Sequence, residues 1–230
     1  MIRTNKYSSV INNGNIPCVI CGWESQQIVF DKKQSPRNDF TYSQGMPQPL
    51  VSQVVKCNNC GLLFINPRKM ICEITAGYIK ADELGYSSQW RQRVRTFERK
   101  LQLIEQFISH GSIIDVGCAS GEFLYVARNH GWKTFGIEIN EKLADIGKRK
   151  MGIEIFNGTL EEANIPERSY DVCTLFDVLE HLPEPFLTLC KIHSILKDNG
   201  LLVINFPDVE SFSSKIFRRK WWFFLEDHLY

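Results

Sequence analysis

Residues 113–121 read IIDVGCASG, and this stretch decides the fold. Its β-branched residues predict a buried strand that carries Asp115 near its end, and the glycines from Gly117 onward predict a tight turn into a helix. A second apolar run, KTFGIEI, follows, and its acidic residue Glu138 stands twenty-one positions after Gly117. An acidic residue about 20 positions after such a turn can accept hydrogen bonds from ribose hydroxyls. The spacing therefore predicts a site for a nucleoside cofactor.

The order of residues in this turn, D-x-G-x-A-x-G, separates two kinds of cofactor. Asp115, two residues before the first glycine, would repel a pyrophosphate but suits a cationic ligand that carries an amino group. The stretch resembles the first motif of class I S-adenosylmethionine-dependent methyltransferases, which usually runs D-x-G-x-G-x-G. Ala119 stands at the position of the middle glycine. The alternative is an ordinary strand-to-helix turn with a buried aspartate.

Three further stretches occur in the order that this resemblance requires, which extends it over residues 94–230. FNGTLEEANIPERSYDV (156–172) is similar to the family's adenine-contacting segment and fourth strand, and YDVCTLFDVLEHLPEP (170–185) to the tip of that strand. ILKDNGLLVINFP (195–207) is similar to the family's next helix, glycine turn and fifth strand. The resemblance implies S-adenosylmethionine as the cofactor. The contacts it implies are Asp115, Gly117, Cys118, Ala119, Gly121, Glu138, Ile139, Thr159, Leu160 and Phe176.

The alternation of strand and helix patterns predicts an α/β fold with a Rossmann-like parallel sheet, helices on both faces, and ligands at the carboxyl ends of the strands. The family's core has seven strands, whereas five are counted as far as Phe206. We therefore expect a sheet truncated after strand five, with the C-terminal strands missing. The expected strands are 112–116, 133–138, 153–156, 170–176 and 200–206, and the expected helices are 91–108, 121–129, 141–150 and 185–197.

Four of the eight cysteines form two pairs with metal-ligand spacing, Cys18-Val-Ile-Cys21 and Cys57-Asn-Asn-Cys60, each followed by glycine. Two such knuckles supply four sulfurs for a tetrahedral zinc ion. Disulfides are the alternative, and the lack of a secretion signal disfavours them. Residues 16–69 are thus predicted to form a small zinc-ribbon-like module with short strands at 26–30, 53–57 and 61–67.

Composition sets the remaining limits. A chain of 230 residues has the length of one large domain, or of one domain with a small module, and its 43% hydrophobic content is sufficient for a buried core. The net charge of +1 gives no global attraction to nucleic acid or to a membrane, and no apolar stretch approaches membrane-spanning length. We expect a cytoplasmic protein with a disordered lead over 1–15, the zinc module over 16–69, a linker or cap over 70–93 and the methyltransferase domain over 94–230.

The stretch after the fourth strand carries the candidate chemistry. His181 lies where the methyl group is expected, and in the O-methyltransferases that this chain resembles such a histidine is a candidate base. The alternatives are a structural histidine, or a divalent site for Mg²⁺ or Mn²⁺ similar to the carboxylate-x-x-Glu-His cluster of some O-methyltransferases. That second metal site would use Asp177, Glu180, His181 and His228.

The acceptor is less constrained than the cofactor. An N-terminal four-cysteine module ahead of this core resembles methyltransferases of surface-polysaccharide and natural-product pathways. We expect a small hydroxylated acceptor, such as a nucleotide-linked sugar. One alternative is an RNA methyltransferase that grips RNA with the zinc module, aided by FRRKWW (217–222), although the neutral net charge argues against nucleic acid. Another is an inactive S-adenosylmethionine-binding or scaffold protein.

Overall fold

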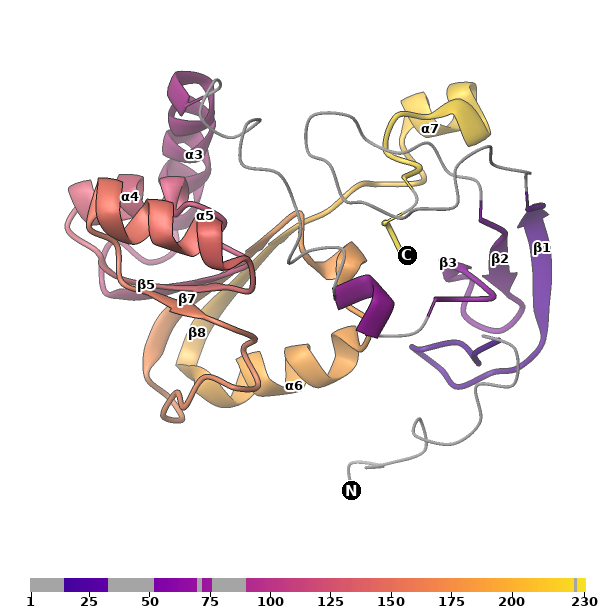
Figure 1. Ribbon diagram of the computed structural model, residues 1–230, viewed down its shortest axis with the longest axis horizontal. Coiled ribbons are helices and arrows are strands. Elements are labelled where there is room, and N and C mark those ends of the chain that lie inside the picture. The colour runs from indigo at the N-terminus through magenta and orange to yellow at the C-terminus, as the bar shows by residue number, and fades with distance from the viewer. Residues whose placement is uncertain (1–14, 33–51, 70–71, 76–89, 226) are drawn as a thin grey trace.

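Two β-sheets organise the chain in the computed structural model, a small antiparallel sheet near the N-terminus and a larger parallel sheet (Figure 1). The structure describes residues 15–32, 52–69, 72–75, 90–225 and 227–230. All but the last residue of the predicted lead and most of the predicted linker therefore lie outside the described residues, and the predicted domain boundaries stay predictions.

The larger sheet has five strands in the order β6-β5-β4-β7-β8, and all of its pairs are parallel. The chain runs outward from β4 to β6 and then returns to β7, so strand order reverses between β4 and β7. In open α/β sheets, ligands bind in the crevice at this reversal. The predicted Rossmann-like α/β fold is confirmed. The strands are β4 Ser112–Val116, β5 Lys133–Glu138, β6 Ile155–Asn157, β7 Tyr170–Phe176 and β8 Leu196–Asn205.

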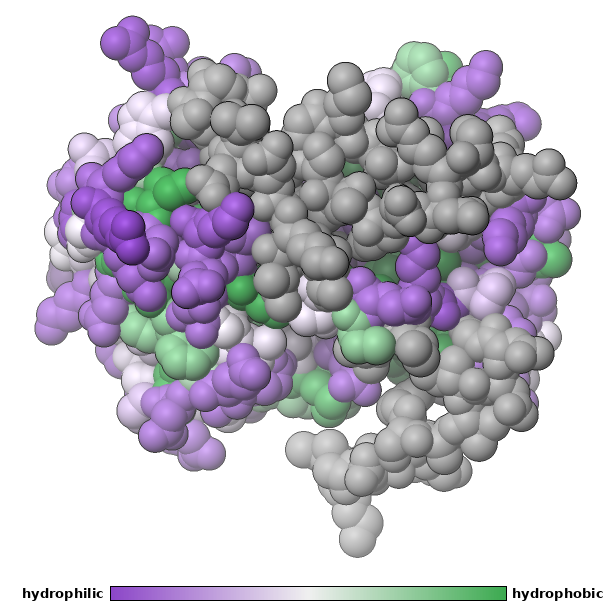
Figure 2. Space-filling model, in the orientation of Figure 1, coloured by the Kyte–Doolittle hydropathy of each residue, from purple (hydrophilic) through white to green (hydrophobic). Residues whose placement is uncertain are grey.

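Helices cover both faces of this sheet. Alternate residues of a strand point to opposite sides, and apolar side chains on each side pack against helices. Ile113 packs in one cluster with α3 (Trp90–Glu105) and α4 (Glu122–Asn129), whereas its neighbour Ile114 packs in another with α6 (Pro185–Ile195). The first face also holds α5 (Glu141–Ile146), which continues as a π-helical turn over Gly147–Met151. Figure 1 shows α6 on the side of the sheet away from α3, α4 and α5. Hydrophilic side chains cover most of the surface over α4 and α5 (Figure 2), as expected for helices with one buried face.

The junction of α6 and β8 differs from the prediction of a helix to residue 197 followed by a glycine turn. The helix ends at Ile195 and β8 begins at once. Leu196 pairs with Tyr170, but the next pair is Leu201 with Val172, so four residues of β8 bulge out of the ladder. Asn199 adopts a left-handed φ of 64° in this bulge. The predicted turn is therefore an irregularity inside the strand.

The small sheet contains β1 (Gln26–Phe30), β2 (Val54–Cys57) and β3 (Leu63–Ile65), paired antiparallel in that order. Its core combines Cys18, Val55, Cys57 and Phe64, and Tyr230 from the C-terminal end packs against it. These strands confirm the three predicted ones within two residues at each end. The long loop predicted between the cysteine pairs lies largely at 33–51, outside the described residues.

The last part of the chain returns to the space between the two sheets, where Figure 1 marks the C-terminus. After α7 (Phe212–Phe217) and a 3-10 turn over Arg218–Lys220, it reaches the C-terminal segment, residues 227–230. The Ile65 N–H donates to the Leu229 carbonyl at 3.0 Å, and the Leu229 N–H donates to the Glu180 carbonyl at 2.7 Å. One residue thus joins β3 to the turn that follows β7. Within the described part of the chain, no helix is both long and apolar enough to cross a membrane.

Candidate active site

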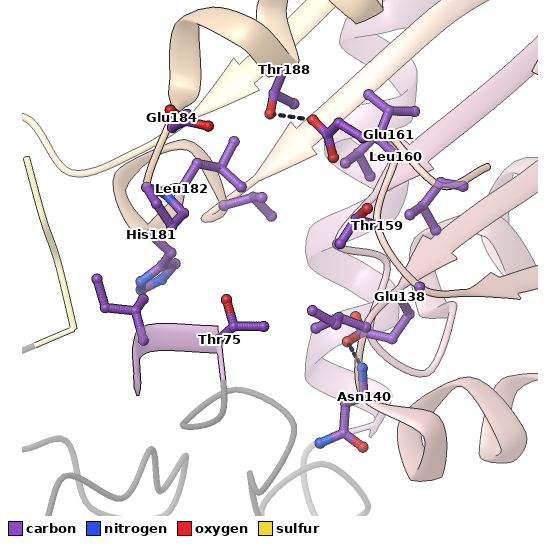
Figure 3. Close-up of a pocket in the computed structure, with 18 of the residues that line it drawn as sticks. Thr75, Glu138, Asn140, Thr159, Leu160, Glu161, His181, Leu182, Glu184 and Thr188 are labelled. Carbon is purple, nitrogen blue, oxygen red and sulfur yellow. Dashed lines mark hydrogen bonds between the residues drawn. The ribbon is translucent and has the colours of Figure 1, made fainter. Parts of the chain in front are cut away.

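A cavity of about 400 Å³ opens at the carboxyl ends of the parallel strands. Figure 3 shows its two walls facing each other. We call the wall formed by 137–140 and 158–161, at the ends of β5 and β6, the cofactor wall. We call the wall formed by 181–188, which runs from the turn after β7 into the start of α6, the acceptor wall. Thr75, from the helical residues 72–75, lies between them at one end. The cavity therefore lies where the sheet topology predicts ligand binding.

Glu138 is the central polar group of the cofactor wall. One carboxylate oxygen accepts the Ala119 N–H and the other accepts the Asn140 N–H, both at 2.8 Å. Burial raises the pKa of Glu138 above its ordinary value, and the backbone donors oppose that rise. Its side chain is 8% exposed and lines the cavity. This carboxylate is fixed in place and has acceptor capacity left for a ligand's hydroxyls.

The turn after β4 supplies the edge of the cofactor wall. Gly117 has a left-handed φ of 75°, and a Cβ there would lie 2.5 Å from Val178 Cγ2. Glycine is therefore required both by the backbone conformation and by the close approach of the turn after β7. Ala119 also has a positive φ, 50°, and both it and Gly117 line the cavity. Ala119 replaces the usual middle glycine in this turn, and its N–H donates to the Glu138 carboxylate.

Four residues predicted to contact the cofactor do not line this cavity: Asp115, Cys118, Gly121 and Phe176. The Asp115 carboxylate is 3% exposed and accepts the Thr174 hydroxyl at 2.7 Å, which turns it toward β7. Burial raises its pKa to about 7. Cys118 and Gly121 support the turn, since the Gly121 N–H donates to the Cys118 carbonyl at 2.8 Å. The roles predicted for these residues stay predictions.

Phe176 ends β7 beside the inner end of α3. Its ring packs edge-on to Phe123 at 4.9 Å, and the Lys100 ammonium lies 4.1 Å from its centroid. Burial lowers the pKa of Lys100, and the charges of Asp177 and Asp115 oppose that shift. Phe176 thus belongs to the packing between α3, α4 and the sheet.

The segment after β6 forms the far part of the cofactor wall. The Gly158 N–H donates to the Glu138 carbonyl at 3.0 Å, which ties this segment to the end of β5. Thr159 and Glu162 exchange hydrogen bonds, since the Thr159 N–H donates to the Glu162 carboxylate at 2.8 Å and the Glu162 N–H to the Thr159 hydroxyl at 3.3 Å. The predicted cofactor residues Thr159, Leu160 and Ile139 all line the cavity here.

His181 faces the cavity from the acceptor wall, in the 3-10 turn Leu179–His181. Its Nδ1 lies 3.0 Å from the Asp227 carbonyl oxygen. Because a carbonyl only accepts, Nδ1 carries the hydrogen in this arrangement and Nε2 is the basic nitrogen of the ring. Burial lowers the pKa of His181 to about 4, so the ring is neutral at physiological pH.

Three of the four residues predicted for a divalent site come together. One ligand atom each of Glu180, His181 and His228 lie within 4.8 Å of one another. The Glu180 carboxylate is 3% exposed, and neither of its oxygens has a hydrogen-bond partner among the described residues. Burial raises its pKa to about 7. Asp177 lies outside this cluster, where its carboxylate accepts the Asn205 amide at 2.6 Å.

The four paired cysteines also come together. Their sulfurs lie within 4.8 Å of one another, with Cys18 3.5 Å from Cys60 and Cys21 3.5 Å from Cys57. Zn–S bonds of about 2.3 Å give a tetrahedron with sulfur–sulfur edges of about 3.8 Å, so the donor set fits zinc.

The two cysteine knuckles repeat the same backbone hydrogen bonds. The Gly22 N–H donates to the Cys18 carbonyl at 2.7 Å, and the Gly61 N–H donates to the Cys57 carbonyl at 3.0 Å. Both glycines have left-handed φ values, 71° and 79°. Two matching knuckles with all four thiols facing one point are the arrangement expected of a structural metal site.

Sequence reasoning missed several residues that shape the site. Asn140 caps α5, its side chain accepting the Leu143 N–H at 3.2 Å, while its own N–H holds Glu138. An asparagine directly before a helix-forming run was a usable signal. The bond between Thr188 and Glu161, 2.9 Å long across the cavity, had no such signal, because only the fold brings α6 near β6. Figure 3 shows this bond joining the two walls.

Comparisons with known proteins find similarity to methyltransferases. A family model described as a methyltransferase domain matches residues 89–230. The ubiquinone biosynthesis O-methyltransferase of Coxiella burnetii is 26% identical over 110 residues, covering 45% of this chain and 47% of the relative. The demethylmenaquinone methyltransferase of Staphylococcus saprophyticus is 25% identical over 122 residues, covering 50% of this chain and 49% of the relative. The chain thus spans about half the length of the curated relatives it matches.

A solved structure from Thermotoga maritima, described as an S-adenosylmethionine-dependent methyltransferase and possible histamine N-methyltransferase, is also similar. It is 23% identical with a TM-score of 0.51, and the match covers 63% of this chain and 69% of that one. This likeness shows the fold. Because the family model spans residues 89–230 of the 230 and the sheet has the expected topology, the chain belongs to the methyltransferase-domain family.

Proposed function

We propose that the protein transfers the methyl group of S-adenosylmethionine to a hydroxyl of a small acceptor bound against the acceptor wall. The observation that carries this proposal is that Glu138 and His181 line one cavity from opposite walls. A cofactor whose ribose binds Glu138 can then direct its methyl group toward His181. The hydroxyl preference is supported by a histidine at this position and by relatives that are named O-methyltransferases.

The chemistry is an in-line displacement. The acceptor oxygen attacks the methyl carbon, the carbon–sulfur bond breaks, and its electron pair stays on sulfur to give S-adenosylhomocysteine. The hydroxyl proton must leave, and a neutral imidazole beside the methyl group can take it. Most of the rate comes from holding oxygen, carbon and sulfur in line.

The cluster of Glu180, His181 and His228 supports a second candidate role for this histidine, as a ligand of Mg²⁺ or Mn²⁺. A buried carboxylate with two unpartnered oxygens is costly, and a cation would satisfy it. One oxygen and two nitrogen donors suit such an ion better than Ca²⁺. When bound, the ion would lower the pKa of an acceptor hydroxyl. The same nitrogen cannot serve as base and ligand at once, so the two roles are separable.

We also propose that Cys18, Cys21, Cys57 and Cys60 hold a structural zinc ion. The acceptor remains a small hydroxylated molecule, such as a nucleotide-linked sugar or a natural-product or polysaccharide intermediate. RNA is less well supported, since the aromatic–basic stretch 217–222 is partly used inside the fold. Trp221 is buried and donates to Ser213 at 3.0 Å, and Arg219 donates to the carbonyls of Asp31 and Ser52.

The experiment is methyl transfer from isotopically labelled S-adenosylmethionine to a panel of phenols, nucleotide sugars and RNA, assayed with and without Mn²⁺. The base role predicts that His181→Ala lowers turnover by about 10²–10⁴-fold and spares cofactor binding. It also predicts that the activity of the wild type is insensitive to chelators. The metal role predicts Mn²⁺-dependent activity, lost in a chelator too weak to strip cysteine-bound zinc, and lost equally in Glu180→Ala and His228→Ala. Glu184→Ala is the matched control, an acidic residue of the same wall outside the cluster.

Full activity in His181→Ala would reject both roles and return this histidine to structure. Cofactor binding without turnover on any acceptor would favour an inactive scaffold. Salt-dependent binding and methylation of RNA would favour the nucleic-acid alternative.

A further inference from the structure

We infer that Arg68 is a positioning residue, through which the four-cysteine module holds the acceptor wall of the cavity in place. This inference rests on the proposed function in one respect, that residues 181–188 face the acceptor. The contacts that carry it join Arg68, three residues past β3, and the C-terminal segment 227–230 to the turn after β7, whose Pro183 lines the cavity.

Arg68 is a buried cation directed at carbonyl oxygens of two distant segments. One terminal nitrogen donates to the Pro183 carbonyl at 3.2 Å and to the Tyr230 hydroxyl at 2.8 Å, and the other donates to the Leu229 carbonyl at 3.5 Å. Its guanidinium also lies 4.7 Å from the centre of the Tyr230 ring. Only the planar fork of arginine can reach several acceptors in this way. Arg68 is therefore built into the junction and is not a surface cation.

The C-terminal segment completes the connection. Leu229 bonds through its carbonyl to β3 at Ile65 and through its N–H to Glu180, and the Tyr230 hydroxyl donates to the Pro183 carbonyl at 3.0 Å. The Tyr230 ring packs on the core of the small sheet, which contains Cys18. Cys18, β3 and Arg68 are thus joined to the 179–183 turn by a short, continuous set of contacts.

The acceptor wall depends on this junction more than the cofactor wall does. The turn before Pro183 is a 3-10 turn of three residues, closed by bonds of 3.0 Å from the His181 N–H and 3.3 Å from the Leu182 N–H. Such short turns have poor hydrogen-bond geometry and need outside support. Glu138, by contrast, is held by the backbone of the parallel sheet's own loops. Loss of Arg68 should therefore loosen one wall and spare the other.

The test compares the full chain with Arg68→Met and Arg68→Lys, and uses Arg168→Met as the control, an exposed arginine paired with Asp198. Hydrogen–deuterium exchange reports on the amides of His181, Leu182 and Leu229. In Arg68→Met we expect about 10-fold or faster exchange at these amides, because the three hydrogen bonds by which Arg68 supports the turn and the C-terminal segment are lost. We expect the exchange rates of Arg68→Lys to lie between those of Arg68→Met and the wild type. The exchange rates of Arg168→Met should match those of the wild type.

Two binding measurements separate positioning from general stability. Calorimetry with S-adenosylhomocysteine should give the wild-type affinity for Arg68→Met. Electron paramagnetic resonance with Mn²⁺ alone should show weaker binding in that variant, because His228 and Glu180 flank the junction. If the wild type binds no Mn²⁺, the proposed divalent site fails, and the exchange experiment still decides the role of Arg68.

Removing the zinc ion proposed for the module should act on the same wall. We expect Cys18→Ser, or a strong chelator, to raise exchange at 179–183 as Arg68→Met does. Tyr230→Phe, which removes one hydroxyl, gives a milder test if Arg68→Met does not fold. Unchanged exchange at 179–183 in Arg68→Met or Cys18→Ser would overturn the inference. Exchange raised equally around Glu138, with weakened S-adenosylhomocysteine binding, would also overturn it and make Arg68 a general stabilising residue.

Discussion

Glu138 offers the sharpest test of the cofactor site. Each carboxylate oxygen has two lone-pair sites, and one on each is occupied by the Ala119 or Asn140 N–H at 2.8 Å. One site per oxygen remains, which matches the two hydroxyls of a ribose. Hydrogen bonds to a charged group contribute about 1.5–3 kcal/mol, and the burial of this carboxylate limits screening by solvent.

We therefore expect Glu138→Ala to weaken binding of S-adenosylhomocysteine by about 3 kcal/mol, roughly 150-fold. Glu138→Gln should lose about half of that, since its amide nitrogen only donates and cannot accept one of the two ribose hydroxyls. The assay is isothermal titration calorimetry, with thermal unfolding of the free proteins to show that each variant is folded.

Glu161→Gln is the matched control, a glutamate of the same wall that accepts the Thr188 hydroxyl. It should change affinity little. Binding within twofold of the wild type in Glu138→Ala, or preferential binding of NAD by the wild type, would refute the assignment of this carboxylate to the ribose.

Three further predictions follow from other parts of the fold. Elemental analysis should find one zinc per chain, lost in Cys18→Ser and kept in the exposed-cysteine control Cys72→Ser. Gly117→Ala should lower the free energy of unfolding in urea by about 2 kcal/mol more than Gly131→Ala, since both have positive φ but only the first meets a neighbour. The raised pKa of Asp115 means that the folded state binds its proton more tightly than the unfolded state does. The free energy of unfolding of the wild type, relative to that of Asp115→Asn, should therefore fall as pH rises from 3.8 to about 7. A difference that does not change with pH would contradict this.

Individual strands and the cysteine cluster could be predicted because each depends on a short sequence pattern. The β-branched runs that end at Asp115 and Glu138 were sufficient to place β4 and β5, and the cysteine spacing was sufficient to bring four thiols together. The start of β8 was misplaced because the bulge at Asn199 has the composition of an ordinary turn. Such boundaries depend on which residues pair across the sheet, which the local pattern does not contain.

The site was only partly predictable for a related reason. The direction of a side chain depends on its neighbour strand, and Asp115 turns to Thr174, fifty-nine residues away, instead of lining the cavity. The junction of Arg68 with Tyr230 spans still longer separations and involves single residues of no regular element. The cluster of Glu180, His181 and His228 was anticipated across a similar distance, but from a family resemblance and not from a local pattern.

The two walls of the cavity are supported by different parts of the chain. Changes that affect one wall can therefore accumulate in evolution without affecting the other. The cofactor wall belongs to the sheet, whose strands also form the core, so changes there cost folding as well as binding. The acceptor wall combines a short turn with the start of α6, and the turn is anchored to a separate module by side chains and by the two backbone hydrogen bonds of Leu229. Under the proposed function, substitutions in the module or the C-terminal segment would change acceptor choice while the methyl donor stays the same, which would give a lineage of such proteins a route to new acceptors.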